Sequence, residues 1–357
     1  MDQTTKNKLE TIGFNDFFNS ELENLGVNNS FVARVISEYK EAYRVKDAEG
    51  EYFARITGKH LFNATKRLDF PAVGDWVVIN KTDNEKAIIQ NILPRKTLLQ
   101  KKYSDKKDSQ IIATNIDIAF VVQSLDKDFS LNRFERYFVL TNEGGIKPTI
   151  VLTKTDLITS EELNKIIENI NKRFTNIDIL CSSTITTDGL KELEAYIKKG
   201  MTYCFIGSSG VGKSSLINKL LKSDIIQTSG NSDASGKGRH TTTTRELYIL
   251  DSGGIVIDNP GTREVGIINV GMSIEDVFKK IVGLSKSCKF SDCTHTQEPG
   301  CAILKALSDK TLDSQQYENY VKLKKESESY EMTKLEKKQK DRKLGQFIKK
   351  MMDKRDE

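Results

Sequence analysis

A loop rich in glycine and serine lies near the middle of the chain. Residues 207–214 read GSSGVGKS and match the phosphate-binding pattern G-x-x-x-x-G-K-[ST]. Its backbone N–H groups can wrap around a phosphate chain, and the following helix adds the positive end of its dipole. We expect Lys213 to reach the β- and γ-phosphates and Ser214 to bind Mg²⁺. The expected nucleotide contacts are Gly207, Ser208, Ser209, Gly210, Val211, Gly212, Lys213, Ser214 and Ser215. A glycine-rich turn without nucleotide is the alternative, which the strand expected before the loop and the helix expected after it disfavour.

A second motif favours guanine over adenine. Thr153, Lys154, Thr155 and Asp156 follow an expected strand. The Asp156 carboxylate can accept from both the N1–H and the exocyclic amine of guanine, a donor pair that adenine lacks. The Lys154 stem is expected to lie along the base. Taken alone, T-K-x-D is a short pattern, and an ordinary strand-to-helix turn is its alternative. Ser182 and Ser183 follow the next expected strand and are assigned to the same nucleotide site.

Two further segments have the residue types of nucleotide-sensing switches. Asp258 ends an expected strand and suits water-mediated Mg²⁺ binding, while the N–H of Gly261 suits the γ-phosphate. The polar stretch 228–244 contains Thr242 and Thr243, whose hydroxyls are expected to reach Mg²⁺ and the γ-phosphate. His240 in the same stretch is a candidate for orienting the attacking water. A loop histidine that contacts RNA or solvent is the equally weighted alternative.

Three cysteines and a histidine cluster within a short segment. Cys288, Cys293, His295 and Cys301 form the pattern C-x4-C-x-H-x5-C. Three thiols and one imidazole make the closed four-ligand set of a structural zinc site. Separate buried thiols are the alternative. The other two cysteines, Cys181 and Cys204, lie in expected strands, where packing is their expected role.

The hydrophobic pattern divides the chain into segments of different secondary structure. The segment 1–28 reads as a short helical extension. Five short runs rich in Val, Ile, Tyr and Phe, separated by turns, predict a small closed barrel of the OB type, with a β-sandwich fragment as the alternative. These runs are 31–37, 42–46, 52–57, 75–80 and 87–93. The basic stretch after Pro94 reads as a linker. From residue 111 strands alternate with helices, which predicts an α/β domain with a mostly parallel sheet. Its expected strands are 117–122, 149–152, 178–181, 203–206, 246–250 and 254–258.

The order of the motifs is unusual. The base-reading motif precedes the phosphate loop, whereas a standard GTPase has the reverse order, so the GTPase domain is expected to be circularly permuted. The predicted domains are a helical extension at 1–28, an OB-like barrel at 29–102, the GTPase domain at 103–270, a helical zinc-binding domain at 271–332 and a basic helical tail at 333–357.

Charge and composition limit the possible protein classes. The formal net charge of the 357 residues is +5, and the segment 333–357, with ten basic and five acidic residues, accounts for all of it. Such a tail could bind an anionic partner such as nucleic acid. The alternative is a solvated helix that keeps the protein soluble. No stretch approaches the roughly 18 apolar residues of a membrane helix, and we expect neither a membrane contact nor a secretory signal. Five cysteines exclude a disulfide scaffold.

The combination of motifs resembles the RsgA (YjeQ/YloQ) family of small ribosomal subunit biogenesis GTPases. The resemblance rests on the five-strand barrel, on GSSGVGKSS, GRHTTTT and DNPGTRE in permuted order, and on the cysteine pattern, and it covers roughly residues 30–325. It implies an OB-fold, GTP hydrolysis with Mg²⁺ and one structural Zn²⁺. It also implies that the protein binds the small (30S) ribosomal subunit and its rRNA, and that it hydrolyses GTP in response to that subunit. The nucleotide contacts and zinc ligands implied are those named above. We expect a cytoplasmic monomer.

The sequence departs from the common GTPase pattern at Thr153, where many GTPases have Asn. A single hydroxyl replaces an amide, so some anchoring of the loop and base is expected to be lost. Three alternative functions are considered. They are a permuted GTPase that serves the large subunit, an rRNA-binding protein with a vestigial nucleotide site, and an ATP-dependent P-loop kinase. The barrel and zinc pattern disfavour the first. The intact Lys213, Ser214 and Asp258 disfavour the second, and Asp156 disfavours the third.

Overall fold

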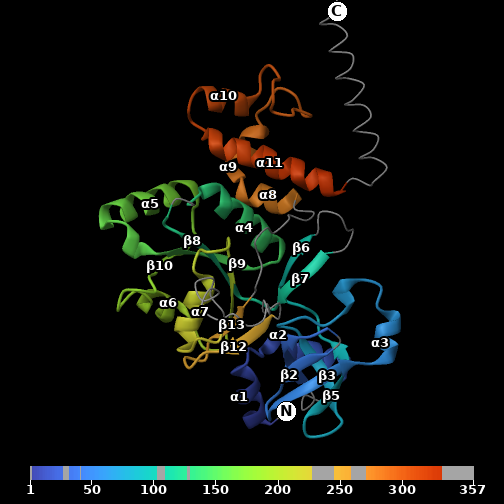
Figure 1. The fold of residues 1–357 in the computed structure, drawn as a ribbon. Helices are drawn as coiled ribbons and strands as arrows, with labels where there is room; N and C mark the ends of the chain where they lie inside the picture. The colour runs from blue at the N-terminus through green and yellow to red at the C-terminus, as the bar shows by residue number, and fades with distance from the viewer. Residues whose placement is uncertain are drawn as a thin grey trace, which may run out of the picture. The chain divides into compact units, whose positions relative to one another are not determined.

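The computed structural model describes residues 2–26, 32–40, 42–102, 109–126, 129–226, 245–258 and 271–331. The chain divides into two compact units, residues 1–266 and residues 267–357. The first unit holds a barrel and an α/β sheet, and the second is helical (Figure 1). The domain boundaries within these units remain predictions.

Five strands in the first unit close into a barrel. They are β1 (Val32–Glu38), β2 (Tyr43–Lys46), β3 (Glu51–Ile56), β4 (Trp76–Lys81) and β5 (Lys86–Ile92). β1 pairs with both β2 and β4, and β3 pairs in parallel with β5, so the order β1-β2-β3-β5-β4 returns to β1. Alternate residues such as Val35, Val45 and Ile89 fill the interior. The predicted five-strand barrel is confirmed, and closure through β1 and β4 excludes the sandwich fragment.

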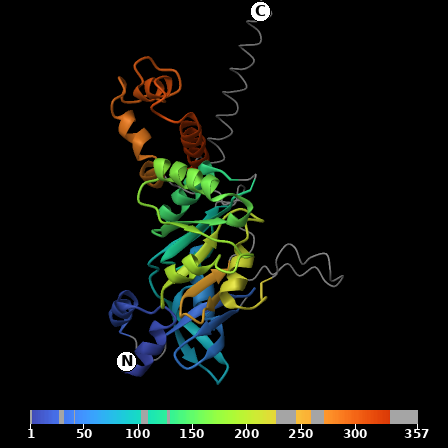
Figure 2. The same cartoon turned by 90° about the vertical axis from the view of Figure 1, so that its left-hand side faces the viewer.

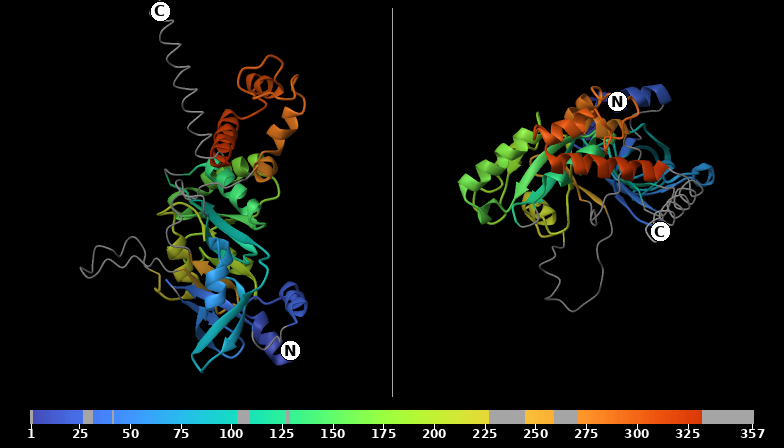
Figure 3. Two further views of the ribbon diagram at one scale, coloured as in Figure 1. Left: turned by 90° about the vertical axis from the view of Figure 1, so that its right-hand side faces the viewer. Right: turned by 90° about the horizontal axis from the view of Figure 1, so that it is seen from above.

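The predicted helical extension forms α1 (Gln3–Glu10) and α2 (Asp16–Leu25), which pack against the barrel (Figure 3). Asp2 and Asn15 accept hydrogen bonds from the first turns of these helices and so begin them. Phe14 lies edge-on to Trp76 of β4, with the ring centroids 4.9 Å apart. Between β3 and β4 the chain forms the short helix α3 (Gly58–Asn63) and the 3-10 turn η2 (Arg67–Asp69), neither of which was predicted.

The rest of the first unit is an α/β sheet. Its strands are β8 (Ile118–Ser124), β9 (Lys147–Thr153), β10 (Ile179–Cys181), β11 (Thr202–Ile206), β12 (Glu246–Ile249) and β13 (Ile255–Asp258). They lie in the order β10-β9-β8-β11-β13-β12, all parallel except β12. All six strands were predicted, and their order along the chain confirms the circular permutation.

Helices cover both faces of this sheet (Figures 1 and 2). One face carries α6 (Lys191–Tyr196) and α7 (Lys213–Leu221), whose Leu193 and Leu216 share a core cluster with Phe120. The other carries α4 (Leu131–Glu143) and α5 (Ser160–Arg173). A buried ion pair joins these two helices, with Arg173 Nε 2.8 Å from Glu135 Oε1. The 3-10 turn η3 (Thr155–Leu157) precedes α5.

The stretch after Pro94, interpreted from the sequence as a linker, is partly a β-hairpin. β6 (Leu98–Lys102) pairs antiparallel with β7 (Ser109–Thr114), and the linker prediction is wrong for these residues. Buried residues such as Leu99 and Ile111 alternate with polar residues in this segment. The many lysines and polar residues make this alternation hard to recognise in the sequence.

The barrel and the α/β sheet are joined by strand pairing and by a buried arginine. β1 pairs with β12 at Ser37 and Glu246, so the two sheets are continuous. The Arg34 side chain of β1 is 1% exposed. Its guanidinium donates to the carbonyls of Ile12 (2.6 Å), Gly74 (3.3 Å) and Asn115 (3.2 Å) and to Thr202 Oγ1 (2.9 Å). One side chain therefore holds the N-terminal extension, the barrel and the strand β11 together.

The second unit is described on its own. It contains α8 (Gly271–Val277), α9 (Lys279–Ser285), α10 (Ala302–Ser308) and α11 (Ser314–Glu331). Phe278 packs edge-on against Tyr320 of α11, with the ring centroids 5.4 Å apart. The predicted tail, 333–357, lies outside the described residues. Across both units, none of the helices in the described ranges has the length and apolarity needed to cross a bilayer.

We predict that Arg34→Met lowers the free energy of unfolding by about 3 kcal/mol, because it removes four donated hydrogen bonds and leaves buried carbonyls unpaired. Urea denaturation followed by tryptophan fluorescence of Trp76 measures this. The control is Arg44→Met on the same barrel, whose side chain is 44% exposed and whose loss should cost less than about 1 kcal/mol. Equal losses for the two variants would contradict the role assigned to Arg34.

Candidate functional site

The described parts of the predicted nucleotide-binding motifs lie at one edge of the α/β sheet. Parallel strands end at the same edge, and here β9 ends at Thr153, β10 at Cys181, β11 at Ile206 and β13 at Asp258. The base-reading residues therefore lie on the β9 and β10 side, the phosphate loop follows the central strand β11, and Asp258 lies on the neighbouring strand. Such an edge is where open α/β sheets bind their ligands.

The phosphate loop has a conformation that its glycines permit. Gly207 packs so closely on β8 that a Cβ there would lie 2.3 Å from the Val122 carbonyl oxygen. Gly212 has a φ of +96° and leads directly into α7. Lys213, the first residue of α7, folds back over the loop, and its Nζ donates to the carbonyls of Gly207 (2.8 Å) and Ser208 (2.6 Å). The loop is thus preformed around the lysine that is expected to meet phosphate.

The Lys213 ammonium lies in an environment that disfavours its charge. Burial lowers the pKa of Lys213 to about 8, while the nearby Asp258 carboxylate acts in the opposite direction. A negatively charged phosphate placed at the loop would restore the charged form. The loop is therefore electrostatically suited to a polyanion.

Thr153 anchors the phosphate loop from the neighbouring strand. Its Oγ1 donates to the Val211 carbonyl at 2.6 Å, and the Gln123 carbonyl lies 3.4 Å away. The threonine is 3% exposed. Thr in place of Asn was expected to anchor the loop less well. The phosphate loop is nevertheless anchored, because the Thr153 hydroxyl connects β9 to residues 207–214.

The base-reading residues are connected to one another. The Asp156 carboxylate accepts a short hydrogen bond from Ser183 Oγ, which also accepts from the N–H groups of Ile185 (3.2 Å) and Thr186 (3.4 Å). Thr155 Oγ1 donates to the Ser182 carbonyl at 3.2 Å. These bonds hold the loop after β9 against the loop after β10. Asp156 is thereby held in a fixed orientation at the edge of the sheet.

Two residues of this site were not predicted from the sequence. Asp126, just after β8, accepts from Lys154 Nζ at 2.8 Å and from Ser124 Oγ at 2.9 Å, which fixes the Lys154 side chain. Tyr137 of α4 is 5% exposed and its hydroxyl is hydrogen-bonded to Ser208 of the phosphate loop. Asp126 could have been suspected from its place after a strand, whereas Tyr137 gives no sequence signal because it resembles any core residue of α4.

Four predicted residues, His240, Thr242, Thr243 and Gly261, lie outside the described residues. In the chain, β12 begins shortly after the first of the two segments that contain them, and β13 ends shortly before the second. Their roles stay predictions.

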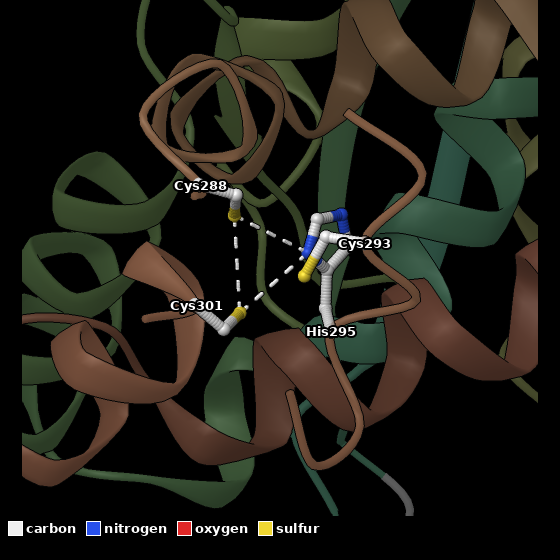
Figure 4. A group of neighbouring side chains, drawn as sticks. All are labelled: Cys288, Cys293, His295 and Cys301. Atoms are coloured by element: carbon white, nitrogen blue, oxygen red, sulfur yellow. Dashed lines mark hydrogen bonds between the residues drawn. The ribbon is translucent and has the colours of Figure 1, made fainter. Parts of the chain in front are cut away.

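The predicted metal ligands come together in the second unit (Figure 4). The ligand atoms of Cys288, Cys293, His295 and Cys301 all lie within 4.8 Å of one another. His295 Nδ1 is 3.6 Å from the Sγ atoms of Cys288 and Cys301, which are 3.9 Å apart. A tetrahedral Zn²⁺ with bonds of about 2.3 Å to sulfur separates its ligands by about 3.8 Å. The four residues therefore fit one zinc ion.

The loop around this cluster holds the histidine in position. Burial, together with the charge of Lys324, lowers the pKa of His295, so its imidazole is neutral and able to ligate. The His295 carbonyl accepts from Tyr317 Oη of α11 at 2.7 Å. Glu298, which the sequence analysis did not single out, accepts from the N–H groups of Thr294 (2.9 Å) and Thr296 (3.0 Å) and so closes the loop. His60, by contrast, contacts the Asp69 carbonyl through its Nε2 at 2.6 Å and lies in neither of the two sites.

The chain is similar to proteins of one GTPase family. The sequence model of the RsgA GTPase matches residues 92–268. The chain is 41% identical to small ribosomal subunit biogenesis GTPase RsgA 2 of Lactiplantibacillus plantarum over 299 residues, 84% of each chain. It is 37% identical to RsgA 1 of Bacteroides thetaiotaomicron over 345 residues, 96% of each. Among solved structures, it is similar to YjeQ from Thermotoga maritima, with a TM-score of 0.59 and 29% identity over 82% of this chain and 96% of that one. It is also similar to YloQ, a circularly permuted GTPase, with a TM-score of 0.58 and 25% identity over 85% and 96%.

We predict that the affinity for a non-hydrolysable GTP analogue falls about tenfold between pH 7 and pH 9. The pKa of Lys213 is about 8 in the free protein, and bound phosphate raises it, so binding above that pH must take up a proton. Fluorescence titration with a labelled analogue measures the slope. Lys213→Ala should bind more weakly at pH 7 and show a flatter profile. If the affinity fell equally with pH in the wild type and in Lys213→Ala, Lys213 would not be the group that takes up the proton.

We predict about one Zn²⁺ per chain in protein purified under reducing conditions. Metal analysis by mass spectrometry measures it. Cys301→Ser removes a thiolate ligand and should lose the metal, together with the cooperative unfolding of the second unit. Cys181→Ser, which changes a half-buried cysteine in β10, should keep the metal. Wild-type protein without zinc, or equal zinc in both variants, would exclude the site.

Proposed function

Because the chain belongs to the RsgA GTPase family, we propose that it is a GTPase that binds the small ribosomal subunit and assists its late maturation. The observation that carries this proposal is the meeting of Asp156, Lys213 and Asp258 at one edge of the sheet, in the permuted order of motifs. Its curated relatives, which match most of this chain, are named as biogenesis GTPases of the small subunit.

The geometry of the edge supports a role for each of these residues in binding the nucleotide. Asp156, held by Ser183, accepts from guanine, while Lys154, held by Asp126, covers the base. Ser182 and Thr155 complete the base side, and the N–H groups of 207–215 together with Lys213 take the phosphates. The Ser214 hydroxyl and, through water, Asp258 offer the hard oxygen donors that suit Mg²⁺. When bound, Mg²⁺ neutralises charge on the β- and γ-phosphates.

Hydrolysis needs a group that orients water, and this chain lacks the usual one. Ras-type GTPases place a Gln directly after the switch glycine, whereas here Thr262 follows Gly261. We assign the role to His240, with Thr242 and Thr243 reaching Mg²⁺ and the γ-phosphate. The free protein is then slow, because the histidine acts only once a partner fixes its segment. The small subunit is the activating partner.

The remaining parts of the chain supply the contacts to the subunit. OB barrels bind oligonucleotides on their outer faces and loops. The zinc unit and the basic tail, which carries the whole net charge of +5, add phosphate contacts that weaken with salt. The protein is proposed to act as a cytoplasmic monomer that carries one structural Zn²⁺.

We predict that Asp156→Asn weakens GTP binding at least tenfold and shifts the preference toward xanthine nucleotides. The amide can donate to the oxygen that replaces the guanine amine, whereas the carboxylate cannot. Competition binding with GTP, XTP and ATP measures the preference. A wild-type protein that binds ATP and GTP equally would contradict the assignment.

The proposed function is tested by co-sedimentation with separated ribosomal subunits. The protein should pellet with small subunits in the presence of a non-hydrolysable GTP analogue, less with GDP, and not with large subunits. Raising the salt concentration should weaken the binding, because phosphate contacts release counterions. Binding to large subunits alone would instead favour a GTPase of large-subunit assembly.

A further inference from the structure

An exposed aromatic ring lies between two cations on the outer face of the barrel. Phe53 of β3 points away from the interior that Tyr52 and Ala54 fill, and it is 53% exposed. The strand pairing places Arg44 of β2 on one side of it and Lys86 of β5 on the other. Because paired residues of neighbouring strands point to the same face, the three side chains form a row across β2, β3 and β5 (Figure 1).

The ion pairs of the two cations in this row are exposed. The Arg44 guanidinium lies 5.6 Å from the centre of the Phe53 ring, and its Nε is 3.5 Å from Glu51 Oε2. Lys86 Nζ is 3.5 Å from Asp83 Oδ2. All four charged side chains are at least 40% exposed, and ion pairs of this kind contribute little to stability. A phosphate can therefore replace Glu51 or Asp83 as the partner of the cation.

The same face leads along β3 to a cavity. Arg55 is the next outward residue after Phe53, and Thr57, two positions further, lines a cavity of about 850 Å³. Outward residues of one strand are about 6.6 Å apart, so Phe53 lies about 13 Å from Thr57 along the chain. One wall of the cavity comes from α3, which follows Thr57, and another from the end of β5.

Amide side chains line this cavity. They belong to Asn63 of α3 and to Gln90 and Asn91 of β5. In the described ranges of the chain, none of these three amides forms a hydrogen bond with the protein. An amide offers one acceptor and two donors, and such groups pair bidentately with the edge of a nucleobase. The volume lies within the range of roughly 300 to 1,000 Å³ that small-molecule pockets have, and it is sufficient for one unpaired base.

The connection between β3 and β4 is fixed to the barrel around the cavity. Arg95 donates through Nε and Nη2 to the two carboxylate oxygens of Asp75 at 2.9 and 2.8 Å, and through Nη2 to the Phe70 carbonyl at 2.8 Å. His60 Nε2 lies 2.6 Å from the Asp69 carbonyl. A cavity that is already formed loses less conformational entropy when a ligand enters it.

We propose that this face of the barrel binds single-stranded RNA, with one base stacked on Phe53 and a second base in the cavity, an inference that rests on the proposed function. Arg44 and Lys86 pair with phosphates on either side of the stacked base. The amides of the cavity bind the edge of the second base. The bases of an RNA duplex are paired and stacked on one another, so the face selects single-stranded loops and ends.

The chemistry of the face favours RNA over another protein. The centres of protein–protein interfaces are apolar and poor in charge, whereas here aromatic rings lie among cations. Tyr39 is 39% exposed, and its ring centroid lies 6.3 Å from that of Phe53. Arg55 and Lys59, both exposed, add positive charge toward the cavity. Aromatic rings combined with cations form the platforms on which single strands stack.

Fluorescence anisotropy of labelled RNA, measured with the full chain, tests the stacking position. The probes are homopolymers of A, C and U of about ten nucleotides and a duplex of the same length. Phe53→Ala should weaken binding of the single strands about tenfold, as expected for the loss of one stacked base. It should leave binding of the duplex unchanged. Phe53→Trp, which keeps a stacking ring, should bind the single strands as the wild type does.

The cations and the amides should give different signatures in the same assay. Lys86→Ala should weaken binding of all homopolymers alike and lower the slope of affinity against salt concentration by about one. Asn91→Ala should change the preference among the homopolymers, because it removes a group that contacts base edges. An Asn91→Ala variant that weakens all homopolymers equally, or none, overturns the assignment of the cavity.

Matched substitutions elsewhere on the chain provide the controls. Phe17 on α2 is also an exposed phenylalanine, and Lys165 on α5 forms a similarly exposed ion pair with Glu161. Phe17→Ala and Lys165→Ala should leave RNA binding unchanged. Thermal melting shows that each variant is folded. A folded Phe53→Ala variant that binds single strands as tightly as the wild type, or an equal loss in Phe17→Ala, overturns the proposal.

This inference and the proposed function fail in different experiments. If the wild type pellets with small subunits but Phe53→Ala has no effect on oligonucleotide binding, the inference is wrong and the proposed function stands. If single strands bind through Phe53 but the wild type does not pellet with small subunits, the RNA-binding face stands and the proposed function is wrong.

Discussion

The buried charge of Arg34 is the constraint on which the first unit depends. A guanidinium that is 1% exposed must have hydrogen-bond acceptors, and here they come from three parts of the chain. Ile12 belongs to the N-terminal extension, Gly74 to the barrel, and Thr202 to the strand that leads into the phosphate loop. Because β1 and β12 are joined at one register pair, this cluster fixes the barrel on the nucleotide-binding sheet. The barrel and the phosphate loop therefore belong to one body.

The circular permutation sets the order in which these parts follow one another along the chain. The barrel precedes the sheet in the sequence, and its strand β1 pairs with β12, the strand that follows the first predicted switch segment. The base-reading loops come next, and the phosphate loop lies on the central strand. After Asp258 the sequence continues through the second predicted switch segment to the unit that holds the predicted zinc ligands. The first predicted switch segment thus precedes a strand that pairs with the barrel, and the second precedes the unit that holds the predicted metal ligands.

Much of the fold and site could be predicted from the sequence, and the failures have physical reasons. The strands were recognisable because Val, Ile and aromatic residues recur in short runs, and the phosphate loop and zinc ligands because their chemistry demands residue types at set spacings. The hairpin β6-β7 was taken for a linker because its exposed lysines mask two buried positions. The role of Arg34 could not be predicted from the sequence, since a charged residue in a strand is ordinarily solvent-facing. Thr153 was expected to weaken the site, but its hydroxyl reaches Val211 only in three dimensions.

The proposal that hydrolysis at the nucleotide site depends on the small subunit is tested most directly by single-turnover hydrolysis. Radiolabelled GTP is bound to the protein, and phosphate release is followed alone, with small subunits and with large subunits. The free protein should hydrolyse GTP slowly, small subunits should accelerate it by about a hundredfold or more, in the lower range of activators acting in trans, and large subunits should have little effect. A free protein that already hydrolyses GTP quickly and does not respond to small subunits would contradict the account.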